Sequence, residues 1–238
     1  LKAPVINFPI RYDIEDATKA IEFFKQGAEL EKKAKYFDYI KASIAYKKSV
    51  ENKFKNNKAS ARMIFLYSLL LENSDDKEND ANTIFKLVQI YKNKTLQDAD
   101  FCAAIALFYI RTKKYNAAVN TIDKFLTINK SKSTVELFSV YLQGLVLVGD
   151  LVKAKAVVKK IETVPVEKMS LYTMIKLIDY YKIIGNLERV SEIVEIGRKT
   201  FKKSVALNLE RAGLFFYKED YKSLEKLLSQ LRTINLEG

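Results

Sequence analysis

The chain has 238 residues, of which 48% are hydrophobic and 29% charged, with only three prolines and seven glycines, so its composition can fill a core and excludes a disordered chain. It has no histidine and a single cysteine, which excludes His-based nucleophilic catalysis, an intrachain disulfide, and zinc sites built from His or several Cys. The formal net charge of +12 favours acidic proteins, nucleic acid or an anionic membrane surface as partners.

Residues 1–13 precede the first predicted helix. Pro4 and Pro9 oppose helix formation there, so we expect an extended N-terminal arm that lies against the first helices or docks on a segment before Leu1. Because the first residue is not Met, we expect a fragment of a longer chain. That leaves a cytoplasmic location, a periplasmic location and membrane tethering through a missing N-terminal segment all open. No run of about 18 apolar residues occurs, so no transmembrane segment is expected.

Apolar residues at helical spacing predict six helical hairpins along the rest of the chain, which we expect to form one domain over residues 14–238. Asp13 or Asp16 can cap the first helix. Short polar breaks separate the two helices of each hairpin, among them Gly149-Asp150 and Gly185-Asn186. The predicted hairpins span 14–56, 57–94, 97–130, 133–165, 168–201 and 203–235.

Residues 98–130 show the hairpin pattern most clearly. Apolar residues from Cys102 to Ile110 follow helical spacing, a polar break follows them, and a second helix carries Ala118 and Ile122. A small residue followed one turn later by a bulky one favours close crossing of two helices. Cys102 lies on the apolar stripe, so a buried, unreactive thiol is expected.

The small-then-bulky step recurs along the chain at intervals of 39, 37, 36, 36 and 34 residues. In this respect the chain resembles the tetratricopeptide repeat (TPR) superfamily, whose unit is a helical hairpin of about 34 residues. The resemblance is degenerate, because the chain has no tryptophan and larger residues replace alanine in the last two repeats, which we expect to be irregular. The crossing positions are Ala42, Ala81, Ala118, Ala154, Val190 and Leu224, followed four residues later by Tyr46, Phe85, Ile122, Val158, Val194 and Leu228.

The TPR resemblance implies an all-α fold, an α-solenoid of about six TPR-like hairpins wound into a right-handed superhelix. It further implies that the first helix of each hairpin lines a concave, partner-binding face. The function it implies is a non-enzymatic protein–protein interaction scaffold or adaptor, such as an assembly factor of a membrane-associated bacterial machine for secretion, motility or the envelope. The partner is another protein or a second copy of the chain. The candidate partner-binding residues are Asp100, Ala103, Leu107, Arg111, Glu136, Ser139, Gln143, Tyr172, Ile175, Asp179, Lys182, Leu209, Gly213, Phe216 and Tyr217.

Other functions find less support in the sequence. No Gly-rich phosphate loop occurs, so we expect no enzymatic activity, no cofactor and no metal site. The densest group of lysines, at Lys153, Lys155, Lys159 and Lys160, is either a solvated face or a contact for acidic protein, phosphate or lipid. The alternative function is therefore a helical repeat that binds nucleic acid or an anionic membrane surface. Acidic residues interleaved along the chain disfavour nucleic acid.

Overall fold

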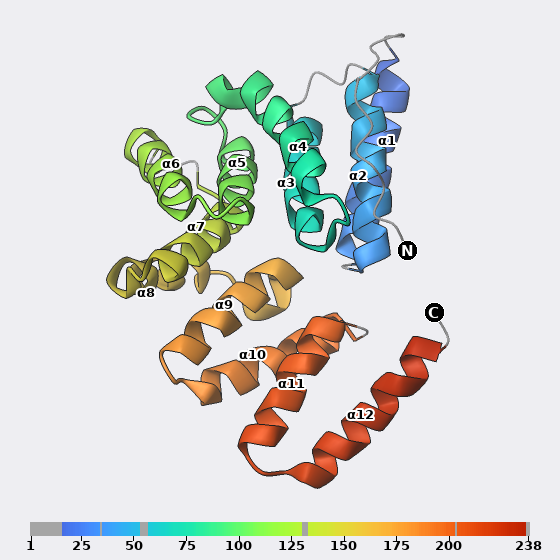
Figure 1. Cartoon of the computed structure of the whole chain (residues 1–238), viewed down its shortest axis with the longest axis vertical. Coiled ribbons are helices and arrows are strands. Elements are labelled where there is room, and N and C mark those ends of the chain that lie inside the picture. Colours follow the sequence, from blue (N-terminus) through green and yellow to red (C-terminus); the bar gives the residue numbers. More distant parts are fainter. Residues whose placement is uncertain (1–15, 34, 53–56, 130–132, 203, 237–238) are drawn as a thin grey trace. The chain divides into compact units, whose positions relative to one another are not determined.

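A computed structural model shows residues 16–33, 35–52, 57–129, 133–202 and 204–236. The predicted arm at residues 1–13 lies outside this described part. The chain divides into two compact units, Leu1–Ile161 and Glu162–Gly238, called here the N-terminal unit and the C-terminal unit. Every regular element in the described part is helical, which confirms the all-α prediction (Figure 1).

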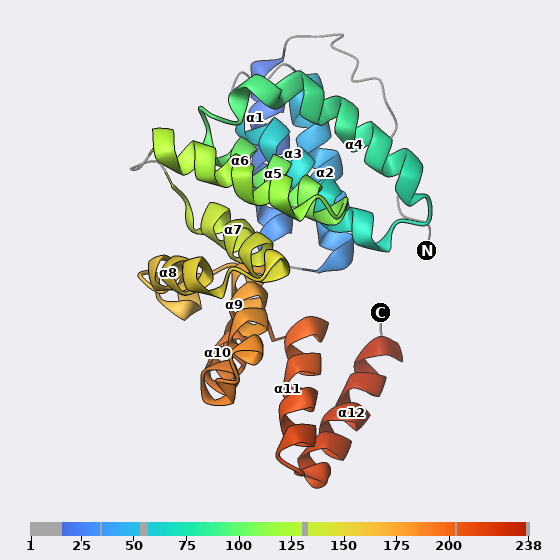
Figure 2. The same cartoon turned by 60° about the vertical axis from the view of Figure 1, so that its left-hand side comes forward.

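The N-terminal unit contains eight α-helices in its described residues (Figure 2). Its α-helices are α1 (Ala17–Lys32), α2 (Tyr36–Glu51), α3 (Lys58–Leu70), α4 (Lys77–Tyr91), α5 (Ala99–Arg111), α6 (Tyr115–Ile128), α7 (Val135–Val148) and α8 (Leu151–Ile161), with 3₁₀ turns η1 (Leu71–Asn73) and η2 (Lys92–Lys94) flanking α4.

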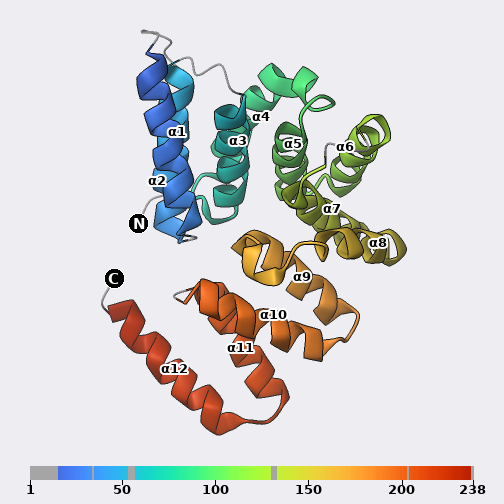
Figure 3. The same ribbon diagram turned by 180° about the vertical axis from the view of Figure 1, so that it is seen from behind.

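The C-terminal unit continues the pattern with two more helical pairs. Each helix packs on the next one along the chain, and the turn η3 packs on α10 (Figure 3). Its elements are η3 (Val166–Lys168), α9 (Leu171–Ile183), α10 (Leu187–Thr200), α11 (Val205–Tyr217) and α12 (Tyr221–Leu236).

Four of the six predicted crossing positions are buried, three of them alanines and the fourth a valine. Ala42, Ala118, Ala154 and Val190 are all fully or almost fully buried. At the first crossing the ring of Tyr46 packs on α1, where a Cβ added to Gly27 would lie 2.9 Å from Cε1 of that ring. Only glycine lets the ring approach this closely.

The predicted register is wrong in α4 and α12. Phe85 and Leu228, which we expected to pack inward, are exposed, whereas Ile84 and Leu227 are buried. In each of these helices, the buried residue is therefore the one immediately before the residue that we expected to be buried. In α4 the reason is its position, because α3 packs mainly on α2 and α5 and has little contact with α4.

One backbone conformation recurs at the turns of four successive hairpins. After the first helix of each, a single residue takes a left-handed φ, between 56° and 82°, in an otherwise right-handed backbone. The intervals between these residues are 36, 36 and 34, the same as those between the predicted crossing positions that lie five residues further on. The four residues are Lys113, Gly149, Gly185 and Glu219.

The same pair of hydrogen bonds closes all four turns. In the second of them, the amide of Gly149 donates to the carbonyl of Val146 at 3.2 Å, and the amide of Asp150 donates to that of Leu145 at 2.9 Å. This is the Schellman ending of a helix, which reverses the chain after a left-handed residue. Its recurrence in both units supports a repeat-like architecture from backbone geometry, independently of side-chain type.

A charged cluster joins three helices of the N-terminal unit. Arg62 on α3 forms ion pairs with Glu31 on α1 and Glu136 on α7, and its Nε donates to Oε2 of Glu31 at 3.3 Å. The hydroxyl of Tyr46 donates to the same Glu31 oxygen at 2.9 Å. The Arg62 guanidinium also lies over the ring of Phe65, 4.5 Å from its centroid. A mostly buried guanidinium therefore holds together helices that are far apart in the sequence.

Two further observations concern the chain as a whole. Cys102 is buried, as expected, and burial raises the pKa of its thiol to about 12, so it stays protonated at neutral pH. None of the described helices combines the length and the apolar character needed to cross a bilayer.

Replacing Arg62 by methionine should destabilise the N-terminal unit by about 3 kcal/mol, because two largely buried carboxylates lose their shared partner. Urea unfolding followed by circular dichroism measures the change. The triple variant R62M/E31Q/E136Q, which removes both stranded charges, should recover at least half of the loss. An R62M chain that unfolds at the wild-type urea concentration would show that the cluster does not hold the helices together.

Candidate functional site

The candidate residues predicted on α5 and α7 divide into buried and accessible ones. The side chains of Ala103, Leu107 and Ser139 are buried, because α3, α6 and α7 cover α5 and because α7 in turn packs on α5, α6 and α8. These three residues are therefore not available to a partner. The sequence pattern did not show which positions of α5 and α7 remain open to solvent.

Glu136 belongs to the Arg62 cluster, and the half-buried Asp100 is close enough for the Arg62 charge to affect its pKa. Burial raises the pKa of Asp100, and the neighbouring Asp98 raises it further while Arg62 opposes both. Burial also raises the pKa of Glu136, against the lowering effect of Arg62. Glu136 is thus paired with Arg62 inside the unit. Arg62 itself was not identified from the sequence, because nothing local marks its partners on α1 and α7.

Arg111 and Gln143, by contrast, line one pocket together. It lies where the α5–α6 turn meets the ends of α3, α4 and α7, and its volume is ≈ 740 Å³. A second pocket of ≈ 450 Å³ adjoins it and shares Lys113, Tyr115 and Leu147 with it. We call the two pockets together the turn groove. Its lining residues are Leu71, Glu72, Lys77, Glu78, Ala81, Ile110, Arg111, Thr112, Lys113, Lys114, Tyr115, Asn116, Ala117, Gln143, Leu147 and Val148.

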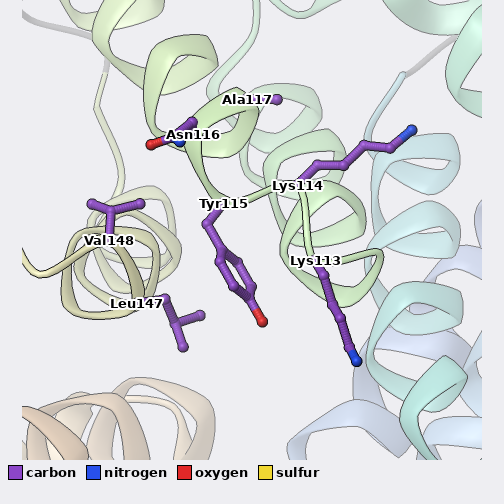
Figure 4. A pocket seen from close by; sticks show the side chains of 7 residues that line it. All are labelled: Lys113, Lys114, Tyr115, Asn116, Ala117, Leu147 and Val148. Atoms are coloured by element: carbon purple, nitrogen blue, oxygen red, sulfur yellow. The ribbon is translucent and has the colours of Figure 1, made fainter.

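The smaller pocket combines an apolar side with charged ends. Figure 4 shows the Tyr115 ring directed between Leu147 and Lys113, whereas Lys114 is directed away from the ring. Leu147 and Val148 are both exposed although they end an otherwise buried helix. The pocket therefore offers an aromatic ring and an aliphatic side chain to solvent beside a lysine.

Arg111 is the most buried charge of the turn groove. Its side chain is 16% exposed, and its Nη1 lies 2.6 Å from Oε2 of Glu72, whose own side chain is 61% exposed. The Nε of Arg111 is buried and has no hydrogen-bond partner. A guanidinium fixed by packing and paired with an exposed counter-ion can exchange that counter-ion for an external carboxylate.

The turn that forms the groove departs from its three counterparts. In the other hairpins the residue after the left-handed one is Asp150, Asn186 or Asp220, whose side chain accepts a hydrogen bond from the backbone of the next helix. Here that residue is Lys114, and no side chain caps α6. The left-handed residue is Lys113, at φ 60°, where two counterparts have glycine. Both choices lower local stability.

The candidate residues of the C-terminal unit lie in two places. On α9, Asp179 pairs with Lys176 at 2.7 Å, and Lys182 reaches Glu210 on α11 at 3.0 Å. Lys176 also lies over the ring of Tyr172, while Ile175 is half-buried. These polar residues are engaged with one another or with α11. On α11, Leu209, Gly213, Phe216 and Tyr217 are exposed.

Four exposed apolar residues lie along α11. Val205, Leu209 and Phe216 fall on one face of the helix by their spacing, Tyr217 follows Phe216 toward the neighbouring face, and all four are more than half exposed. Phe216 also meets Tyr221 of α12 edge to face, with ring centroids 6.4 Å apart. We call Val205, Leu209, Phe216 and Tyr217 the α11 stripe.

Comparison of the chain with protein-family models, curated proteins and solved structures finds no match. The TPR resemblance is therefore supported only by the residues quoted above. Within the described residues no group of three or more Cys, Asp or Glu is arranged to hold a metal ion.

Lys113→Gly should raise the free energy of unfolding by about 1 kcal/mol, because glycine adopts the left-handed conformation without strain. Gly149→Ala, at the equivalent position of the next hairpin, should lower it by a similar amount. A Cβ on Gly149 would meet nothing within 4 Å, so backbone strain is the only expected cause. Thermal and urea unfolding of both variants measure the two changes in the free energy of unfolding. If both substitutions changed the free energy of unfolding in the same direction, the two turns would not be equivalent.

Proposed function

We propose that this chain is a non-enzymatic scaffold that binds another protein, built as an α-solenoid of TPR-like hairpins in a right-handed superhelix. The observation that carries the proposal is the α11 stripe. Large aromatic side chains at the surface are a property of protein interfaces, where they bury much area at little entropic cost. Phe216 is 65% and Tyr217 71% exposed, so a partner that covered them would remove most of their area from water.

The position of the stripe supports the same function. It lies on α11, the first helix of its hairpin, which is the helix that the TPR resemblance assigns to the partner-binding face. The polar residues of α11 beside it are already engaged, since Glu210 pairs with Lys182 and Arg211 pairs with Glu195. The side chains of α11 that remain available to a partner are therefore mainly apolar. Assembly of a membrane-associated bacterial machine is the setting that the resemblance implies.

The charges favour a protein over a phosphate backbone. The alternative, nucleic acid or an anionic membrane surface, is based on the net charge of +12. Yet every arginine whose side chain the structure describes faces a carboxylate. A neighbouring carboxylate lowers the net positive charge that each arginine presents to a nucleic acid. The arginines in question are Arg62, Arg111, Arg189, Arg198 and Arg211.

Site-specific photo-crosslinking in the native cell tests the scaffold function. A photoreactive residue in place of Tyr217 should give a discrete cross-linked protein or a cross-linked dimer, because this side chain would lie within an interface. The same residue in place of Val152, which is 85% exposed on α8 of the N-terminal unit, serves as the control.

A second variant, F216D, should abolish the cross-link at position 217 while leaving the melting temperature unchanged, since Phe216 is exposed and supports little of the core. Cross-linking to RNA instead of protein would favour the alternative function. Equal cross-linking at positions 217 and 152 would contradict a stripe-specific interface.

A further inference from the structure

We infer that the turn groove binds a segment of a partner protein in which a carboxylate side chain lies next to large apolar side chains. The carboxylate replaces Glu72 on Arg111, and the apolar side chains lie on Tyr115 and Leu147. This inference rests on the proposed scaffold function and adds a partner chemistry and a second site to it, on a different unit from the α11 stripe.

The charge of the turn groove selects an acidic ligand. Four cations line it, Lys77, Arg111, Lys113 and Lys114, against two acids. The two acids are Glu72 and Glu78, so the groove carries a net positive charge before any ligand enters. A short segment with one or two carboxylates complements this charge, and like-charged or neutral segments do not.

The pair of Arg111 and Glu72 provides the exchangeable contact. Arg111 is packed in place, so a ligand that pairs with it does not have to order a long flexible side chain. Glu72 is mostly solvated, and an exposed partner of this kind gains little from the pair and is released at little cost. An incoming carboxylate can take the position of the Glu72 carboxylate on Nη1 of the same guanidinium.

The apolar part of the turn groove explains why a bare acid is not the expected ligand. Leu147 and Val148 are exposed at the end of α7, and the Tyr115 ring stands beside them (Figure 4). Volumes of ≈ 740 and ≈ 450 Å³ are large enough for several side chains. The carboxylate of the ligand provides specificity through Arg111, and its apolar side chains bury surface area beside that contact.

The α5–α6 turn, which lines the groove, also has residues that lower its local stability. Lys113 occupies a left-handed position that glycine fills at two counterparts, and Lys114 occupies a cap position that Asp or Asn fills at all three. Residues that contradict local structural preference without a packing benefit are concentrated at functional sites. The residues that contradict it here are also cations of the groove.

A phosphodiester chain fits the groove less well than a protein segment. Glu72 and Glu78 lie in the same pocket as the cations, so successive phosphates would meet them. Tyr115 is the only aromatic residue among the lining residues, whereas single-stranded nucleic acid binds on several stacking rings. A single acidic position followed by apolar side chains avoids both difficulties.

The probes are three capped peptides in which an Asp-Asp pair lies zero, one or two residues before a Leu-Phe pair. Matched peptides replace both Asp by Asn, or both apolar residues by Ser. Titration of the ¹⁵N-labelled chain should shift the backbone amides of residues 111–117 and 147–148 saturably for at least one acidic peptide. Fluorescence anisotropy should show binding about tenfold weaker for its Asn or Ser analogue, and weaker at high salt.

Three variants connect the binding to the groove. R111Q should weaken the binding of the acidic peptide about tenfold. K113G should weaken it severalfold although it stabilises the fold, which separates lost binding from lost structure. E72Q should tighten it severalfold, because the competing carboxylate is gone. K155Q, which removes the same charge from an exposed site on α8, is the matched control and should change nothing.

The inference is overturned if no acidic peptide binds, if the Asn analogues bind equally well, or if R111Q and E72Q both leave the affinity unchanged. It is also overturned if a single-stranded oligonucleotide shifts the groove amides and the peptides do not. Cross-linking at Tyr217 distinguishes these failures from failure of the scaffold function. A stripe that cross-links to a partner while the peptides do not bind would leave the scaffold function standing and remove only the groove.

Discussion

The left-handed residue that ends the first helix of a hairpin is the constraint on which the repeated architecture depends. With φ reversed at one residue, two amides reach back to the preceding helical turn and the chain turns sharply into the next helix. In three of the four hairpins with this turn a buried crossing residue follows five positions later, so there the turn fixes which face of the second helix packs on the first. A small residue at that face then sets how closely the two helices approach.

Much of this architecture could be predicted from sequence, because it depends on residues close to one another. Gly149-Asp150 and Gly185-Asn186 combine a left-handed residue with a helix cap, and they mark two turns directly. Lys113 gave no such signal, since lysine rarely adopts this conformation and only the surrounding hairpin imposes it. In α4 the packing partners are not those of a regular hairpin, so a register extrapolated from Ala81 to Phe85 was wrong by one residue.

The candidate site was less predictable, because it depends on contacts between distant segments. Arg111 and Gln143 were expected on an open face and do line the turn groove, but Leu107, one turn before Arg111, is buried. Which positions remain open depends on how α5 is covered by its neighbours. Arg62 pairs with Glu31, 31 residues before it, and with Glu136, 74 residues after it. No local sequence pattern predicts these two contacts.

The central claim is that one of several equivalent turns has lost local stability in favour of a binding groove, and native-state hydrogen exchange of the free chain tests it most directly. The amide of Lys114 closes its turn with a hydrogen bond equivalent to those of Asp150 and Asn186, at similar lengths. The account predicts measurably weaker protection at Lys114 than at Asp150 and Asn186. Equal or stronger protection at Lys114 would contradict it.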